Sequence, residues 1–371
     1  MSPEDDSFQD CENLSELTDD SLTEGYFSSV RLKLLFIFLL TVICVVVALF
    51  SLTVNHTGLN VVEAIDVIIK HISGVTYEEH TDEWFNDKYI WGNSLPRLLF
   101  TILAGIGLAV AGAAMQSTMN NPLADPYTTG VSSGACLGLA VAIVLGLSIN
   151  YGDIYLIIIL AFFFALIPMI AIILLAPKTK ASPSTLILAG VAISYLFNSA
   201  NTFIMVAVDS ETLSSIYTWQ IGTLSSIRWA NIPLSAISVI IGSAIILFLS
   251  RELNLLSLGD ASATSLGIDP DNLRIICLVS IAFIVGTIVG SAGIIGFVGL
   301  ITPHMVRSVM GSDSRYVIPA AAVLSVTLMI IADMISRSMM DFDSIPVGSV
   351  LSLIGAPIFL YLIVRRKSRV W

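Results

Sequence analysis

The sequence predicts an all-α integral membrane protein of ten transmembrane helices, and three observations support this class: composition, charge distribution and an internal repeat. Of 371 residues, 56% are hydrophobic and 12% are charged, and the mean hydropathy is +0.89. Soluble domains carry about 25% charged residues, so most of this chain is expected to face lipid. Each span must satisfy its own backbone hydrogen bonds inside a bilayer, which favours helices.

Ten apolar segments are candidates to cross a hydrocarbon core about 30 Å thick, at about 1.5 Å of rise per residue. They cover residues 33–53, 96–117, 128–149, 154–176, 184–208, 232–250, 272–291, 293–310, 316–335 and 347–364. The eighth is the weakest, because three glycines and Pro303 interrupt it. Residues 31–371 are therefore expected to form one ten-helix domain.

The first 30 residues have a different composition. They hold nine carboxylates and no lysine or arginine. Such a segment buries too little apolar surface to fold alone, so we predict a disordered acidic tail. It has no positive n-region and no small-residue cleavage site, so it does not resemble a signal peptide. A solvated spacer and a docking or regulatory segment are both open interpretations of this tail.

The positively charged residues indicate the orientation. If both termini are cytoplasmic, the cytoplasmic segments carry 12 lysines and arginines and the external segments carry five. The positive-inside rule favours this arrangement over its inverse. We therefore expect a multi-pass protein of the cytoplasmic membrane with both ends inside the cell.

The longest external segment is 54–95. It begins with an amphipathic stretch and continues with an acidic, aromatic patch from Tyr77 to Trp91, and the segment holds His56, His71 and His80. A solvated, partly structured loop is expected here. The histidine spacing matches no compact zinc motif, so no metal ligand is assigned.

An internal repeat links the two halves. Gly105, Ala111, Gly112, Pro122 and Gly130 recur as Gly286, Ala292, Gly293, Pro303 and Gly311, each 181 residues later. This common offset indicates a duplication. Transporters often place their pathway at the interface of such repeats. The small residues also predict close helix packing.

The source of energy is constrained by what the chain lacks. None of its six lysines follows a glycine, so the Gly-Lys-Ser/Thr ending of a phosphate-binding loop is absent. Charged groups inside the spans are nearly absent, which argues against a proton-coupled carrier. The nearest candidates for such a group, Asp333 and Arg337, lie four residues apart at the external end of the ninth span and are candidates to pair with each other. Energy must come from a partner, or transport is passive.

Short motifs follow one another in a fixed order over residues 31–367. They include Leu95–Arg97, Ala111–Gln116, Asn121–Pro126, Gly130–Ala135, Gly296–Leu300, Pro303–Arg307, Ile345–Gly348 and Gly355–Pro357. This ordered set resembles the FecCD-type permeases, the membrane subunits of ABC importers for iron-siderophore, haem and cobalamin. The acidic tail and residues 76–87 have no counterpart in that pattern.

The resemblance implies a type II importer fold and a set of partners. These are a second copy of the chain, two cytoplasmic ATP-binding subunits that hold ATP and magnesium, and an external solute-binding protein. No cofactor is expected on this chain, and no nucleic acid. Segment 257–270 is expected to couple to the ATPase through Ala261, Ser262, Ala263, Thr264, Ser265, Leu266 and Gly267.

The resemblance also implies roles for six further residues. Arg97 and Arg337 match external arginines that meet carboxylates of the binding protein. Asn121, Leu123, Pro183 and Ser184 match the lower gate. Each has a plainer alternative: an interfacial side chain for Arg97, pairing with Asp333 for Arg337, and turn initiation for the gate residues.

The function expected from the sequence is thus a permease subunit that carries an iron chelate or cobalamin across the cytoplasmic membrane, powered by a separate ATPase. No residue is assigned to catalysis. Two alternatives remain: a secondary carrier, or a membrane-embedded transferase. The transferase would have to use the carboxylates of the external loop, namely Glu78, Glu79, Asp82 and Glu83.

Overall fold

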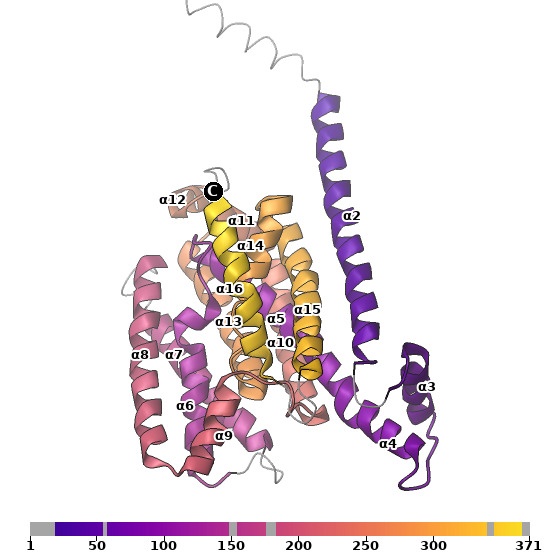
Figure 1. The fold of residues 1–371 in the computed structure, drawn as a ribbon. Helices are drawn as coiled ribbons and strands as arrows, with labels where there is room; N and C mark the ends of the chain where they lie inside the picture. Colours follow the sequence, from indigo (N-terminus) through magenta and orange to yellow (C-terminus); the bar gives the residue numbers. More distant parts are fainter. Residues whose placement is uncertain (1–18, 55–57, 148–153, 176–182, 340–344, 366–371) are drawn as a thin grey trace, which may run out of the picture.

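The computed structural model describes residues 19–54, 58–147, 154–175, 183–339 and 345–365. Every regular element in these ranges is a helix. The helices form an elongated bundle in which α12 (Asp260–Ser265) lies at one end, and α4 (Asp82–Tyr89) and α9 (Ser210–Gln220) lie at the other (Figure 1). We call these the α12 end and the α4 end.

Each of the ten predicted spans contains one helix. By length and composition, seven stretches of the described residues could cross a membrane: Ser29–Ser51, Asp82–Thr118, Tyr155–Leu175, Pro183–Ala207, Trp229–Phe248, Pro270–Ala292 and Ser314–Ser338. The helices that form them are α2 (Asp19–Ser51), α5 (Leu95–Thr118), α7 (Ile154–Leu175), α8 (Pro183–Ala207), α10 (Ile232–Phe248), α13 (Pro270–Ala292) and α15 (Ser314–Ser338). The other three predicted spans hold α6 (Val131–Val144), α14 (Val298–Met310) and α16 (Val347–Arg365). Of these, α6 and the part Val347–Leu362 of α16 are apolar helices too short for that length criterion.

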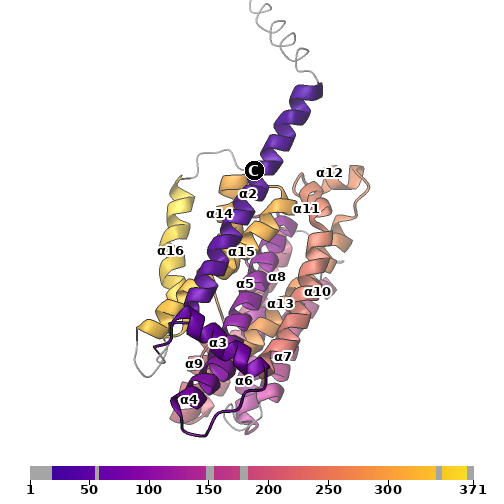
Figure 2. The ribbon, with the colours of Figure 1, turned by 90° about the vertical axis from the view of Figure 1, so that its right-hand side faces the viewer.

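The first helix begins earlier than predicted. α2 starts at Asp19, so the tail boundary placed at residue 30 is corrected for residues 19–30, and residues 1–18 lie outside the described ranges. The reason is cooperativity: once an apolar run has formed a helix, each added residue needs no new nucleus. α2 stands at the edge of the bundle and packs along α15 (Figures 1 and 2).

The predicted external loop, 54–95, is more ordered than expected. It holds α3 (Val61–Ile72), α4 and a π-helical turn, Ile90–Ser94, that continues into α5 without a break. Asn60 and Glu63 form a capping box at the start of α3, which satisfies backbone N–H groups that a helix start leaves unpaired. The apolar face of α3 buries Ala64 against Leu52 and Ile90.

The packing supports the predicted duplication. The contact between α5 and α15 corresponds to the contact between α13 and α7. In the same way, the contact between α6 and α7 corresponds to the contact between α14 and α15. Likewise, α6 contacts α8 and α14 contacts α16. Helices α5–α8 thus correspond to α13–α16. Since α5 begins at the α4 end and α13 begins at the α12 end, the two halves are inverted, as in many transporters.

The duplicated glycines have diverged. Gly130 and Gly311 both keep a positive φ, at 87° and 80°. Gly112, however, lies inside α5, whereas Gly293 ends α13 with a φ of 75°. A Cβ at position 112 would lie 1.8 Å from the Gly299 carbonyl oxygen of α14, so this glycine permits backbone contact between α5 and α14.

Polar contacts reinforce this junction of α5 and α14. The buried Arg307 of α14 donates to the Ala113 carbonyl (3.2 Å) and to the Ser117 hydroxyl (3.0 Å). The side chain of Gln116 donates to the Leu300 carbonyl at 2.9 Å. Hydrogen bonds between spans are worth about 0.6 kcal/mol on average, so these contacts add specificity to a junction made mainly by close packing.

Candidate functional site

Two buried arginines meet one carboxylate near the α4 end. Arg97, at the start of α5, donates its Nε to Asp333 Oδ1 at 2.8 Å, and its Nη2 lies 2.7 Å from the same oxygen. Arg337 Nε lies 3.1 Å from Asp333 Oδ2. The three side chains are only 6%, 11% and 4% exposed, in the order Arg97, Arg337, Asp333. This Arg–Asp–Arg cluster joins α5 to α15.

The same cluster reaches the first span. Arg337 donates to the Val54 and Ser51 carbonyl oxygens, at 2.9 and 3.1 Å, at the C-terminal end of α2. The expected pairing of Arg337 with Asp333 is thus present, and Arg97 shares it. Docking onto a binding protein stays a prediction for both arginines, and it would require them to turn from Asp333 toward a partner.

Arg228 is an exposed cation at this end, and it belongs to none of the motifs found in the sequence. Its Nη1 donates to Asn93 Oδ1 (3.2 Å) and to the Ser225 and Ile227 carbonyl oxygens (2.9 and 2.8 Å). The residue as a whole is exposed, but partial desolvation of its guanidinium, and secondly the positive charge of Arg97, lower its pKa. Positive charge therefore gathers near the start of α5.

Stacked rings hold the external segment on the bundle. His71 stacks on Trp91 with ring centroids 4.1 Å apart, and Trp91 contacts Trp229 at 5.1 Å. The Trp229 indole donates to the Trp91 carbonyl at 2.8 Å. His71 Nδ1 lies 2.8 Å from an Asp87 oxygen, which closes the α3–α4 hairpin. In the described residues no group of three or more His, Cys, Asp or Glu could hold a metal ion.

The predicted gate residues Asn121 and Leu123 lie in the turn after α5. Asn120 has a φ of 46°, and Asn121 N–H donates to the Gln116 carbonyl at 3.0 Å, which ends the helix in a left-handed cap. The Asn121 side chain accepts from Leu123 N–H at 2.9 Å. This contact presents the Leu123 side chain, 49% exposed, at the α12 end.

The other two gate residues, Pro183 and Ser184, begin α8. This helix packs on the short helix Pro126–Thr129 that follows the Asn121 turn. The contact is close at Gly190, where a Cβ would lie 2.6 Å from the Thr128 carbonyl oxygen. The structure therefore places all four residues at the α12 end, with the Asn121 turn and α8 connected through the short helix Pro126–Thr129.

The predicted coupling segment is a short exposed helix at the same end. α12 covers Asp260–Ser265, and Ala263 is its fully buried residue. Thr264, Ser265, Leu266 and Gly267 are exposed. The coupling segment and the two docking arginines therefore lie at opposite ends of the bundle, as their predicted partners require.

One long span exposes polar side chains along an apolar helix. Asn198, Ser199 and Thr202 of α8 are exposed, beside the exposed rings of Tyr195 and Phe203. Polar groups that face lipid are costly. This face is therefore better suited to another protein surface or to water than to acyl chains.

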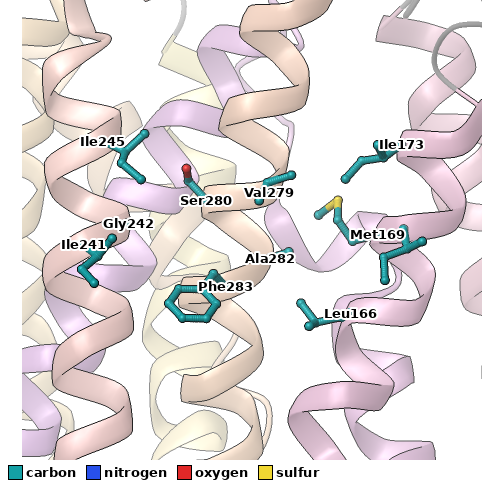
Figure 3. A pocket seen from close by; sticks show the side chains of 11 residues that line it. Leu166, Met169, Ile173, Ile241, Gly242, Ile245, Val279, Ser280, Ala282 and Phe283 are labelled. Carbon is teal, nitrogen blue, oxygen red and sulfur yellow. The ribbon is translucent and has the colours of Figure 1, made fainter.

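A cavity of about 250 Å³ lies between α7, α10 and α13 (Figure 3). Its lining is apolar except for Ser280, whose hydroxyl donates to the Ile276 carbonyl of its own helix. Phe283, Met169 and Ile241 contribute from the three helices. Such a lining has no side chain to bind a polar cargo, so we do not place the pathway here.

Comparisons with known proteins match most of this chain to one family of transport proteins. The model of the FecCD transport family matches residues 40–365. Among curated relatives, the Fe(3+)-citrate import system permease protein YfmE of Bacillus subtilis is 33% identical, covering 89% of this chain and 95% of the relative. The hemin transport system permease protein HmuU of Yersinia pestis is 36% identical over 76% and 85%. The cobalamin import system permease protein BtuC of Halobacterium salinarum is 37% identical over 74% and 73%.

A solved structure also matches the fold of this chain. It is described as an inward-facing conformation of an ABC transporter assigned to the metal-chelate type. The TM-score is 0.76 at 30% identity, and the match covers 89% of this chain and 99% of the other.

Proposed function

The chain belongs to the FecCD transport family, and on this premise we propose that it is the permease subunit of an ABC importer driven by a separate ATPase. The observation that carries the proposal is a match along most of the chain, in sequence and in fold, to proteins with that role. The missing phosphate-binding loop supports an ATPase on another chain.

The proposed cargo class is a metal chelate or cobalamin. The named relatives carry ferric citrate, hemin and cobalamin. Molecules of this size need a wide pathway, which a single tightly packed bundle does not offer. We therefore infer that the pathway lies between two copies of the chain, along the polar face of α8.

Cross-linking tests this homodimer. After replacement of the four native cysteines, Ser199→Cys is expected to be joined to its copy in native membranes by a bifunctional maleimide long enough to span the pathway, because two copies of the α8 face would lie opposite each other across a shared axis. The matched control is Val46→Cys on the exposed apolar face of α2, where lipid contact predicts no dimer. Dimers from Val46→Cys alone would contradict the proposed interface.

We further propose that the α12 end faces the cytoplasm and the α4 end faces outward, which the distribution of positive residues favours. The ATPases would then contact α12, and the solute-binding protein would dock near Arg97, Arg228 and Arg337. Complementary charge there would chiefly set orientation and association rate.

Purification tests whether ATP hydrolysis belongs to a separate chain. The chain expressed with its ATPase is expected to co-purify with it, and the complex should hydrolyse ATP. The isolated chain should show no ATP hydrolysis. Hydrolysis by the isolated chain would contradict the proposal, and uptake that persists with an inactivated ATPase would favour a secondary carrier.

The transferase alternative has a separate test. Glu78, Glu79, Asp82 and Glu83 are replaced together by alanine. A permease is expected to keep its transport activity, whereas an enzyme that uses these carboxylates would lose activity. Asp82 and Glu83 lie in the first turn of α4, where negative charge stabilises a helix without any catalytic role.

A further inference from the structure

Arg274 is among the most deeply buried large side chains, and it joins three elements at the α12 end. It belongs to the second turn of α13 and is 1% exposed. Its Nη1 and Nη2 donate to the two carboxylate oxygens of Asp260, at 3.0 and 2.6 Å. Its Nε donates to the Thr118 carbonyl at 3.0 Å.

Each hydrogen-bond partner of Arg274 is the terminal residue of a helix. Asp260 is the first residue of α12, the predicted coupling segment. Thr118 is the last residue of α5, and its carbonyl oxygen is one of those that a helix end leaves without an intrahelical partner. Asn121 and Leu123 follow within five residues of Thr118. One guanidinium therefore connects the coupling segment to the start of the predicted gate turn.

The geometry of the contact favours positioning over simple stabilisation. A bidentate arginine–carboxylate pair fixes orientation as well as distance. By contrast, the Arg274 guanidinium is buried while Asp260 is half exposed, and replacing buried ionic groups with well-packed apolar residues is often neutral or stabilising. Stability alone is thus a weak reason to keep a guanidinium in this place.

α12 has few other attachments. It is six residues long, and of these Ala263 alone is fully buried. The Asp260 side chain is 51% exposed, so it can change its position without opening the core. The short connection 266–269 ties α12 to α13 in any case, whereas a shift of α12 would be transmitted to α5 through this carboxylate and Arg274.

We infer that Arg274 is a positioning residue that transmits displacement of α12 to the C-terminal end of α5 and hence to Asn121 and Leu123. This inference rests on the proposed function, because it takes Ala261–Gly267 as the ATPase contact and the Asn121 turn as the gate. The link itself is a property of one chain and can be measured without partners.

The first experiment measures the link in the full chain alone. Spin labels are attached to Thr264→Cys on α12 and Leu123→Cys in the turn, after replacement of the four native cysteines. Asp260→Asn is expected to broaden the distance distribution between the labels, because it weakens the paired hydrogen bonds between the Arg274 guanidinium and residue 260. The matched control is Asp271→Asn, whose carboxylate lies 3.9 Å from Arg274 but on the same helix, so it makes no bridge to α12. An unchanged distribution in Asp260→Asn, or equal broadening in Asp271→Asn, would overturn the inference.

The second experiment measures coupling in proteoliposomes that hold the complex with its ATPase and its solute-binding protein, with ferric citrate, hemin and cobalamin supplied in turn as cargo. Asp260→Asn is expected to lower the cargo moved per ATP hydrolysed about tenfold, while Asp271→Asn stays within about twofold of the parent. Arg274→Lys should resemble Asp260→Asn, because lysine keeps the charge but cannot form the paired hydrogen bonds. Loss of ATPase binding in Asp260→Asn would overturn the inference, since Asp260 would then act in docking. If the parent complex moves no cargo, the proposed function fails, and the distance measurement still decides the link.

Discussion

Asp333→Ala is expected to cause the largest loss of stability of any single substitution considered, about 3–5 kcal/mol. The change leaves the guanidinium groups of Arg97 and Arg337 buried without their shared carboxylate, where each is at most 11% exposed. Removing one partner of a buried ion pair is costly because the remaining charge is left unsolvated. Thermal unfolding in lipid nanodiscs would measure the loss.

The control for this prediction is Asp66→Ala in α3. Asp66 also pairs with a cation, Lys70 at 2.6 Å, but both side chains are at least half exposed. Exposed pairs of this kind contribute about 0.3–0.5 kcal/mol, so the midpoint should hardly move. A triple variant, Asp333→Leu with Arg97→Leu and Arg337→Leu, should regain much of the loss. Equal effects of Asp333→Ala and Asp66→Ala would show that the cluster carries no special energy.

Gly112→Ala is expected to separate α5 from α14, with a loss of about 1–3 kcal/mol or more. The new methyl carbon would lie 1.8 Å from the Gly299 carbonyl oxygen and 2.5 Å from its carbon. Both atoms belong to the backbone of a helix, so neither can turn aside as a side chain would. The shift should also disturb the hydrogen bonds of Arg307 to Ala113 and Ser117.

Gly92→Ala is the matched control, since a Cβ at position 92 meets no atom within 4 Å. It should therefore leave the unfolding midpoint near that of the parent. Each variant adds one methyl group to a glycine. The difference between their unfolding midpoints therefore measures the cost of disturbing the contact between α5 and α14. A stable Gly112→Ala protein would mean that α5 and α14 can part without cost.

The sequence predicted the features of this fold that the lipid environment determines. Lipid requires long apolar runs, and each of the ten predicted runs contains a helix. The pair Asp333 and Arg337 was predictable because four residues bring side chains onto one helix face. An amphipathic pattern starts at Val61, where α3 begins, but the segment was expected to be a partly structured loop, so the helix itself was not predicted.

Contacts between distant segments were not predictable. Asp333 meets Arg97 across 236 residues, and Trp229 meets Trp91 across 138. Nothing in the sequence near either residue specifies that partner. Arg274 and Asp260 are only 14 residues apart, yet they face each other because the chain turns between α12 and α13. An arginine near the start of a span indicates an interfacial side chain as readily as a link between helices.

The separation of Arg97 from Asp333 has a consequence for how the chain is made. Arg97 begins the second span, and its carboxylate arrives with the ninth. At a synthesis rate of about 5–20 residues per second, the 236 residues between them take roughly 10–50 s. During that interval the nascent α5 carries an uncompensated charge, and its position near the end of a span lets the side chain stay at the lipid–water boundary. The cluster thus closes late in biogenesis, when α15 enters the membrane and locks the earliest spans to the last ones.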